Sequence, residues 1–326
     1  MALKKKDQGA MEDRDRTPVH QPQKISAETE EKIRQIRGQT GYGRRRVKRE
    51  LKRRYQIEVY PQTIDKVIKR LGLPKKHYKS AWRGKTRQSY RADSLLPWER
   101  NEVDTKEILD KKGLPREIYQ HFRQLNHIPR YQWTWTDVAS RVRFLAYSHE
   151  CSWTNGQTFL RYVRSWLALF GVTGPLNISI DGGREWQATT ERSFQSARKE
   201  FYHPLMIEPS VIRKGHPEDN SYVERSHKTD DEEFYVPYGL NWNDEADFLR
   251  GAEWWQIMYN TVREHEGIDD LTPLQKLGKF QPQTHPGIVL IPPIILDRHF
   301  YPEKVVQNVC GVYHVTFVLY HTVIMN

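Results

Sequence analysis

Several features that would assign the chain to a common class are scarce or missing. Its 326 residues include only two cysteines, Cys151 and Cys310, with no CxxC pair or Cys/His cluster, which excludes a zinc finger or a disulfide framework. No apolar run reaches the roughly 18 residues of a membrane-spanning helix. The opening MALKKKDQGAMEDRDR lacks the apolar middle of a signal peptide. We therefore expect a globular protein that stays in the cytoplasm and has no membrane partner.

Acidic residues are scarce in the first third of the chain. Residues 1–92 carry 27 Lys and Arg against 10 Asp and Glu, whereas the remainder carries 25 against 31. A strongly basic segment joined to a mildly acidic one is typical of proteins that bind a polyanion. The charge distribution therefore favours nucleic acid as the partner.

Composition and turn signals divide the chain into five segments. Residues 1–24 mix charges with Pro and Gln without apolar periodicity, which predicts a disordered arm. Residues 25–73 predict three short helices, and 74–98 interleave cations with aromatic residues in an extended basic linker. Residues 99–280 alternate strand and helix patterns. In 281–326, apolar runs such as IVLIPPIIL and VYHVTFVLYHTVI favour strands, either in a small β module or at an edge that pairs with a partner.

The three helices expected in residues 25–73 resemble a helix-turn-helix. Ser26 can cap the first helix, the second runs from Arg44 to Tyr55, and the third starts at Pro61 and ends near Gly72. In this motif the last helix enters the major groove of DNA. The polar and cationic residues expected to contact DNA are Arg44, Arg45, Gln62, Thr63, Lys66, Lys69 and Arg70. The alternative is a small helical bundle with a solvated basic face.

From residue 101 onward the elements follow the order βββαβαβα. Strands are expected at 101–107, 131–138, 141–148, 176–181 and within 205–211, and helices at 155–170, at 190–201 and around Glu224. This is the ribonuclease H-like order. It predicts an α/β fold with a mixed five-stranded sheet flanked by helices.

Motifs in this core resemble the DDE integrase and transposase superfamily, especially bacterial insertion-sequence transposases with an N-terminal helix-turn-helix. DGGREW, which begins at Asp181, resembles the family's Asp-Asn-Gly-x-Glu-Phe, and GHPEDNSYVER, which contains Glu224, resembles Pro-x-x-Asn-x-x-x-Glu-Arg. Asp104 resembles the first-strand aspartate. The resemblance covers roughly residues 26–280. Gly182 departs from the family's Asn, and the 42 residues between Asp181 and Glu224 slightly exceed its usual spacing.

The resemblance implies a reaction and its cofactor. Asp104, Asp181 and Glu224 would hold two Mg²⁺ or Mn²⁺ ions, for which hard carboxylate oxygens are the suitable ligands. A transposase would bind the terminal repeats of a mobile element, cleave at the 3′ end and transfer that end into target DNA. Asn220 and Lys228 share a helix face with Glu224 and are expected to contact the DNA. A homo-multimer on DNA, associated with the nucleoid, is implied in the same way.

Two choices stay open at the level of sequence. Asp137, in YQWTWTDVASR, also follows an apolar strand, but starting the core at Asp104 supplies all three strands before the first helix. The functional alternatives are a ribonuclease H-like nuclease that only cleaves and a domesticated, catalytically silent DNA-binding protein. The acidic run at 230–233 is interpreted as a solvated helix face.

Overall fold

The computed structural model describes residues 25–73 and 94–298, except 112, 126, 214 and 215, together with the backbone of 306–309 and 312–315. The chain divides into two compact units, Met1–Arg83 and Gly84–Asn326. Among the described residues, no helix is long and apolar enough to cross a membrane. The predicted arm and most of the predicted basic linker lie outside the described residues.

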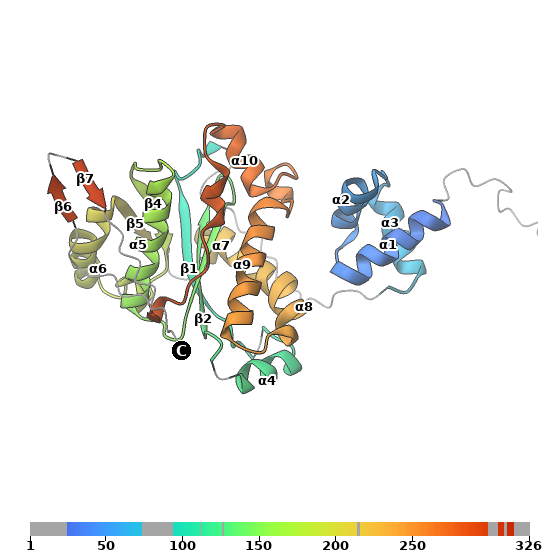
Figure 1. The fold of residues 1–326 in the computed structure, drawn as a ribbon, viewed down its shortest axis with the longest axis horizontal. Coiled ribbons are helices and arrows are strands. Elements are labelled where there is room, and N and C mark those ends of the chain that lie inside the picture. The colour runs from blue at the N-terminus through green and yellow to red at the C-terminus, as the bar shows by residue number, and fades with distance from the viewer. Residues whose placement is uncertain are drawn as a thin grey trace, which may run out of the picture. The chain divides into compact units, whose positions relative to one another are not determined.

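The first unit is a bundle of three helices (Figure 1): α1 (Ala27–Thr40), α2 (Arg44–Tyr55) and α3 (Pro61–Arg70). The Ser26 side chain caps α1 by accepting from the Thr29 amide, and Gly41 ends it in the left-handed region at φ 61°. Apolar residues one turn apart on each helix, such as Ile33 with Ile36 and Val47 with Leu51, form its buried core. The three helices predicted from the sequence are confirmed.

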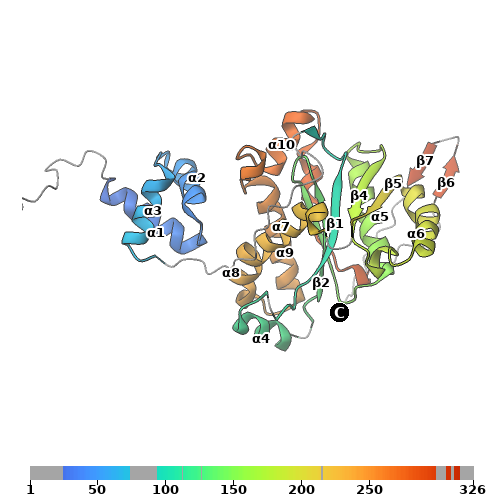
Figure 2. The ribbon, with the colours of Figure 1, turned by 180° about the vertical axis from the view of Figure 1, so that it is seen from behind.

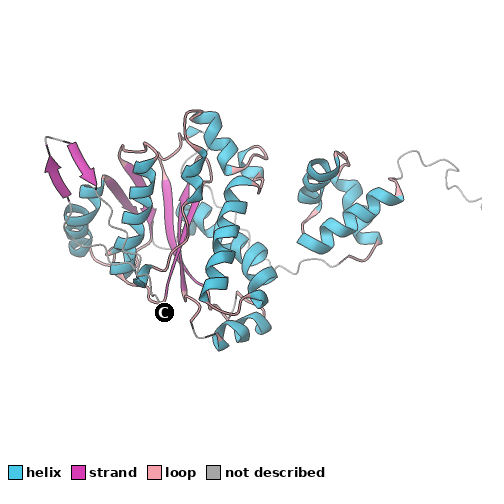
Figure 3. Ribbon diagram, viewed as in Figure 1, coloured by secondary structure: helices cyan, strands magenta, loops and turns pink. Residues whose placement is uncertain are grey.

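The second unit is built on one mixed sheet (Figure 3). Its strands are β1 (Asn101–Glu107), β2 (Tyr131–Asp137), β3 (Arg143–Ser148), β4 (Leu176–Ile180) and β5 (Ile207–Val211). They lie in the order β3-β2-β1-β4-β5, with the first three antiparallel and with β4 and β5 parallel to β1. The predicted ribonuclease H-like α/β fold is confirmed.

Helices cover both faces of this sheet (Figures 1 and 2). They are α4 (Arg116–Gln124), α5 (Trp153–Leu169), α6 (Glu191–Ala197), α7 (Ser221–Asp230), α8 (Val236–Tyr238), α9 (Glu245–Thr261) and α10 (Pro273–Phe280). One core packs α5 against sheet residues such as Trp133 and Trp135, and the other packs α4 and α9 against Leu145 and Tyr147.

Alternation along the strands decides which side chains meet α7. Trp133 and Trp135 on β2 point into the core formed with α5, so Gln132 and Thr134 point to the opposite face. That face is polar and nevertheless buried: Gln132 bonds to Asp230, the last residue of α7. The sheet therefore presents its polar face to the helix that carries Glu224.

The connection between β1 and β2 differs from the sequence expectation. It was expected to be a loop, but it contains α4, whose Ile118 and Phe122 are buried one turn apart. These side chains pack where Gly239 leaves space, since a Cβ there would stand 2.9 Å from atoms of both. The surface around Gly239 lies more than a hundred residues further along the chain. The sequence of residues 116–124 alone therefore gave only a weak indication of a helix.

The segment after α10 also corrects an expectation. The run IVLIPPIIL was predicted as strand, but Pro286–Leu290 forms a 3-10 turn, and Ile288, Val289 and Ile291 are buried in the core beside α5. The two prolines of this run have no backbone N–H to donate to a sheet. An isolated β-bridge pairs Ile295 with Tyr147. Farther on, β6 (Val306–Val309) and β7 (Val312–Val315) form an antiparallel pair. The rest of the predicted β-rich segment lies outside the described residues.

Candidate active site

Strand register brings Asp104 and Asp181 to one place. β1 and β4 are parallel neighbours with Glu102 opposite Ser179, so two residues further along Asp104 comes level with Asp181. Val103 and Ile180 are buried in the core formed with α5. Because successive side chains of a strand point to opposite faces, Asp104 and Asp181 point away from that core. Two carboxylates from distant parts of the chain therefore lie level with each other on one face of the sheet.

Electrostatics link these two acids with the third. Burial raises the pKa of Asp104 well above its usual range, and the negative charges of Asp181, Glu224 and Glu185 raise it further. A hydrogen bond of 2.9 Å from the Thr105 amide opposes this rise only in part. Glu224 lies in the first turn of α7 and is exposed. The charges of Asp181, which follows β4, and of Glu224, on α7, thus both act on Asp104.

Glu185, the acid of the DGGREW motif, is a fourth carboxylate at this place. Its Oε1 accepts a hydrogen bond of 2.9 Å from the Thr105 hydroxyl. Burial raises the pKa of Asp181, and the charge of Glu185 raises it further. The Gly183 amide donates to Asp181 Oδ1 at 3.0 Å, which opposes that rise. The matching Glu in the DGGREW motif was the signal that could have identified it.

The turn that follows Asp181 packs against β2 and α5. Trp186 is fully buried and meets Trp133 edge to face, with ring centroids 5.3 Å apart. Gly156 on α5 allows this close approach, because a Cβ at that position would overlap the backbone carbonyl oxygen of Glu185. The helix and the turn therefore fix each other's position.

Asp137 occupies a different environment. It is fully buried, and its two carboxylate oxygens accept from the Trp98 amide at 2.8 Å and from the Ser140 amide at 2.7 Å. The Ser140 hydroxyl donates to it as well. Burial raises the pKa of Asp137, and these bonds oppose the rise. Asp137 lies opposite Asn101 in the register of β1 and β2, three residues before Asp104. Its carboxylate accepts the hydrogen bonds that close the turn into β3. This geometry favours Asp104 as the first acid of the site.

Three residues of β1 hold α7 on the sheet. Glu102, Asp104 and Lys106 alternate onto the same face. The Glu102 carboxylate accepts from the backbone amides of Tyr222 at 2.7 Å and Val223 at 2.9 Å. At the other end of the helix, Lys106 forms an ion pair with Asp231. The strand that carries Asp104 therefore sets the height and tilt of the helix that carries Glu224.

His227 fills the space between these two contacts. Its Nδ1 lies 3.6 Å from Asp104 Oδ2, and its Nε2 lies 3.1 Å from the Thr134 hydroxyl. Burial lowers the pKa of His227 to about 3, and the charge of Lys106 adds to this effect. The imidazole is therefore neutral near pH 7 and brings no positive charge to the acidic residues.

The acidic run at 230–233 is not a solvated face, and that interpretation was wrong. Asp230 and Arg143 form a fully buried ion pair with 2.5 Å between Oδ1 and Nη1. Glu233 pairs with Arg263 at 2.9 Å, also inside the protein. The cationic partners come from β3 and from the end of α9, so local sequence offered no sign of them. Buried pairs of this kind anchor the end of α7.

The donor set fits hard divalent cations by its chemistry. Carboxylates whose pKa is raised by burial and by neighbouring negative charge, as for Asp104 and Asp181, are stabilised when a cation offsets that charge. Asn220 adds a buried Oδ1 with no hydrogen-bond partner among the described residues. As placed, however, no three His, Cys, Asp or Glu side chains in the described ranges stand close enough to hold one metal ion. The carboxylates would have to draw together to share an ion.

The residues expected to contact DNA are distributed unevenly. Asn220 is 1% exposed and directs its Nδ2 toward the Val103 carbonyl, 3.5 Å away, so it faces β1 instead of solvent. Lys228 is half-buried. In the first unit, Arg44, Arg45, Gln62, Lys66, Lys69 and Arg70 are exposed and Thr63 is half-buried. Within that unit Lys69 pairs with Asp65, and Arg70 pairs with Glu30.

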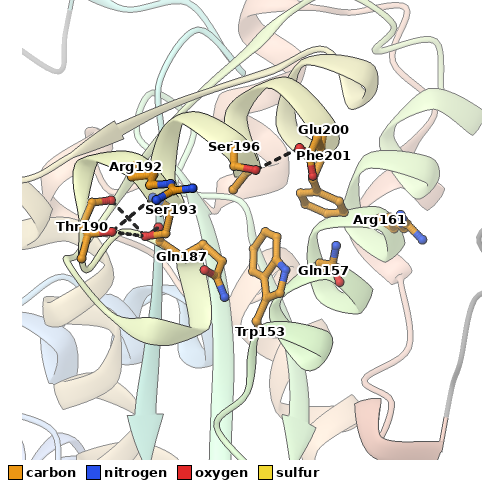
Figure 4. A pocket seen from close by; sticks show the side chains of 11 residues that line it. Trp153, Gln157, Arg161, Gln187, Thr190, Arg192, Ser193, Ser196, Glu200 and Phe201 are labelled. Carbon is orange, nitrogen blue, oxygen red and sulfur yellow. Dashed lines mark hydrogen bonds between the residues drawn. The ribbon is translucent and has the colours of Figure 1, made fainter.

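A cavity of about 710 Å³ lies between α5 and the segment that contains α6 (Figure 4). Trp153 meets Phe201 edge to face across it, with ring centroids 5.1 Å apart. Arg161 and Arg192 contribute cations to its wall. None of Asp104, Asp181 and Glu224 lines it.

One comparison with known proteins bears on the class of the core. Residues 205–273 match the family described as "Integrase core domain", and this segment includes Glu224 and all of α7. The match confirms the resemblance to the DDE transposase and integrase type over that segment. A search of curated proteins found no match. Among solved structures, the chain is similar to one described as "CryoEM structure of simian T-cell lymphotropic virus intasome in complex with PP2A regulatory subunit B56 gamma". The match has 14% identity, covers 72% of this chain and 70% of that one, and has a TM-score of 0.38. Likeness at this level adds no argument.

Proposed function

We propose that the chain is a transposase that binds the terminal repeats of a mobile element, cleaves the 3′ end and joins it to target DNA. The observation that carries the proposal is that Asp104 lies level with Asp181 on one face of the sheet and that the charges of Asp181 and Glu224 both act on it. The integrase core match over residues 205–273 supports the same chemistry.

Each residue has a role in this proposal. Asp104, Asp181 and Glu224 would hold two Mg²⁺ or Mn²⁺ ions, and ions bound there would supply activation of the attacking oxygen and stabilisation of the leaving one. The neutral His227 ring orients the Asp104 carboxylate by filling the space between it and Thr134. Glu102 is a positioning residue, because it fixes the first turn of α7 from the strand that carries Asp104.

The first unit would recognise the element ends. Its third helix presents Gln62, Lys66 and Lys69 to solvent on the face opposite the buried Ile64 and Val67. Residues 25–73 would form this DNA-binding domain, 74–98 the basic linker and 99–280 the catalytic core, which the buried turn at 286–290 extends. Since two ends must be joined, more than one copy of the chain would assemble on the DNA.

The test is cleavage and strand transfer on duplexes that carry candidate element ends, with Mg²⁺ or Mn²⁺ compared with EDTA. We expect joined products that depend on the metal. Cleavage without joining would instead indicate a nuclease. Sequence-specific binding with no chemistry in either metal would indicate a domesticated, catalytically silent DNA-binding protein.

A further inference from the structure

The connection between β1 and β2 is larger than the sheet requires. Two antiparallel strands can be joined by a turn of a few residues. Here residues 108–130 intervene and fold as α4 with its flanking loops. Because β1 is parallel to β4, this insertion leaves the sheet at the same edge as the turn after Asp181. With a strand rise of roughly 3.3 Å per residue, the insertion starts about 13 Å beyond Asp104.

The two faces of α4 have opposite character. Ile118 and Phe122 are buried, and His121 bonds to the Trp242 carbonyl at 2.8 Å. These contacts fix the helix against the segment around α8. On the other side, Arg116 and Arg123 are exposed and lie seven residues apart, so they share one face of the helix. The helix is therefore firmly packed while its cationic face is left toward solvent.

This outer face lines a cavity of about 870 Å³. Three cations contribute to its wall, Lys111, Arg116 and Arg123, together with Tyr119 and Gln120. No acidic residue lines the cavity, and in the described part of the chain these three cations have no hydrogen bond or ion pair. Residues 93–326 carry 25 Lys and Arg against 31 Asp and Glu, so a cavity wall with three cations and no acid among its lining residues departs from the charge of this part of the chain, although Asp110 and Glu117 adjoin it in sequence.

We propose that the exposed face of α4, together with Lys111, binds the phosphate backbone of duplex DNA next to the acidic site. Arg side chains form paired hydrogen bonds with phosphate oxygens, and Gln and Tyr add neutral donors of the kind that contact a DNA backbone. The surface holds the DNA without reading its sequence. The proposal rests on the proposed function in that DNA is the substrate.

The experiment measures duplex binding by the full chain as a function of salt concentration. Arg116→Gln/Arg123→Gln is compared with Lys199→Gln/Lys279→Gln, which removes the same number of charges from exposed positions on other helices. Each lost phosphate contact makes the slope of log K against log salt shallower by about 0.9, so the α4 variant should lose about 1.8. The control variant should keep the wild-type slope, and both should keep the wild-type Tm.

Two results would overturn the inference. One is a wild-type slope in the α4 variant, and the other is an equal change in both variants, which would reflect net charge alone. The proposed function is judged separately, on metal-dependent chemistry of the wild-type protein. A wild type that cuts DNA together with an α4 variant of unchanged slope would remove only the inference drawn here. A changed α4 slope in a protein that never cuts would remove only the catalytic proposal.

Discussion

The backbone amide of Val223 donates a hydrogen bond of 2.9 Å to the carboxylate of Glu102. Glu102 lies two residues before Asp104 on β1, and Val223 lies one residue before Glu224 on α7. One buried carboxylate therefore connects the strand that supplies the first acid to the helix that supplies the last. The contact takes the place of a local cap, because Asn220 makes no side-chain cap hydrogen bond to α7.

Replacing Glu102 tests this connection. Glu102→Ala should release the first turn of α7 and reduce the rise in Tm that Mn²⁺ produces, because Glu224 is no longer held near Asp104. Loss of a cap costs about 1 kcal/mol, so some loss of stability is expected in any case. Glu102→Gln keeps a carbonyl acceptor and should retain more of the response to Mn²⁺. The measurement is Tm with and without Mn²⁺.

Asp244→Ala is the matched control. Asp244 caps α9 by accepting from the Asp247 amide at 2.7 Å, so its loss should lower Tm to a similar degree. The increment that Mn²⁺ adds should stay at the wild-type value. Equal Mn²⁺ increments in Glu102→Ala and the wild type would show that Glu102 stabilises the helix without positioning Glu224.

Gly156→Ala should distort the turn that follows Asp181. The added methyl group would overlap the backbone carbonyl oxygen of Glu185, which cannot rotate away as a side chain could. Overpacking of this kind costs about 1–3 kcal/mol, and the gain in helix propensity of up to about 1 kcal/mol offsets only part of it. Gly174→Ala is the control, since nothing stands within 4 Å of a Cβ there. Urea denaturation that finds the two variants equally stable would contradict this view of the turn.

The stability that Asp137 provides should depend on pH. Burial raises the pKa of this carboxyl in the folded protein above its value in the unfolded chain. The protonated carboxyl is therefore favoured more in the folded state than in the unfolded chain. As the pH rises above about 4, ionisation of Asp137 lowers the free energy of unfolding. Asp137→Asn should lower the free energy of unfolding most at low pH, and the difference from the wild type should shrink as the pH rises. A difference that grows with pH would mean that hydrogen bonds to the ionised carboxylate outweigh burial.

The parts of the fold that the sequence predicted are those with a strong local signal. β1 was expected at residues 101–107 and lies there. α2 has its expected bounds as well, since Gly43 precedes it and Val47 and Leu51 recur one turn apart. The sequence placed Asp181 at the end of a strand and Glu224 in a helix, and in the structure Asp181 directly follows β4 and Glu224 lies on α7.

What the sequence could not supply depends on contacts between distant residues. The partners of the buried Asp230–Arg143 pair are 87 residues apart, so an acidic run was interpreted as solvated. The role of Glu102 required the register of β1 against α7, and α4 required a partner surface at Gly239. In each case the structure of a local segment depends on a contact with a distant residue, and the pattern of the segment itself does not reveal that contact.

The measurement that tests the central claim most directly compares metal-dependent cleavage and strand transfer in four variants, each corrected for its folded fraction. Asp104→Asn, Asp181→Asn and Glu224→Gln should each lose more than the roughly 10–100-fold typical of residues that only support a metal ligand. Asp137→Asn should retain activity within about tenfold of the wild type, because its carboxylate is occupied by Trp98 and Ser140. Full loss in Asp137→Asn with activity kept in Asp104→Asn would contradict the account.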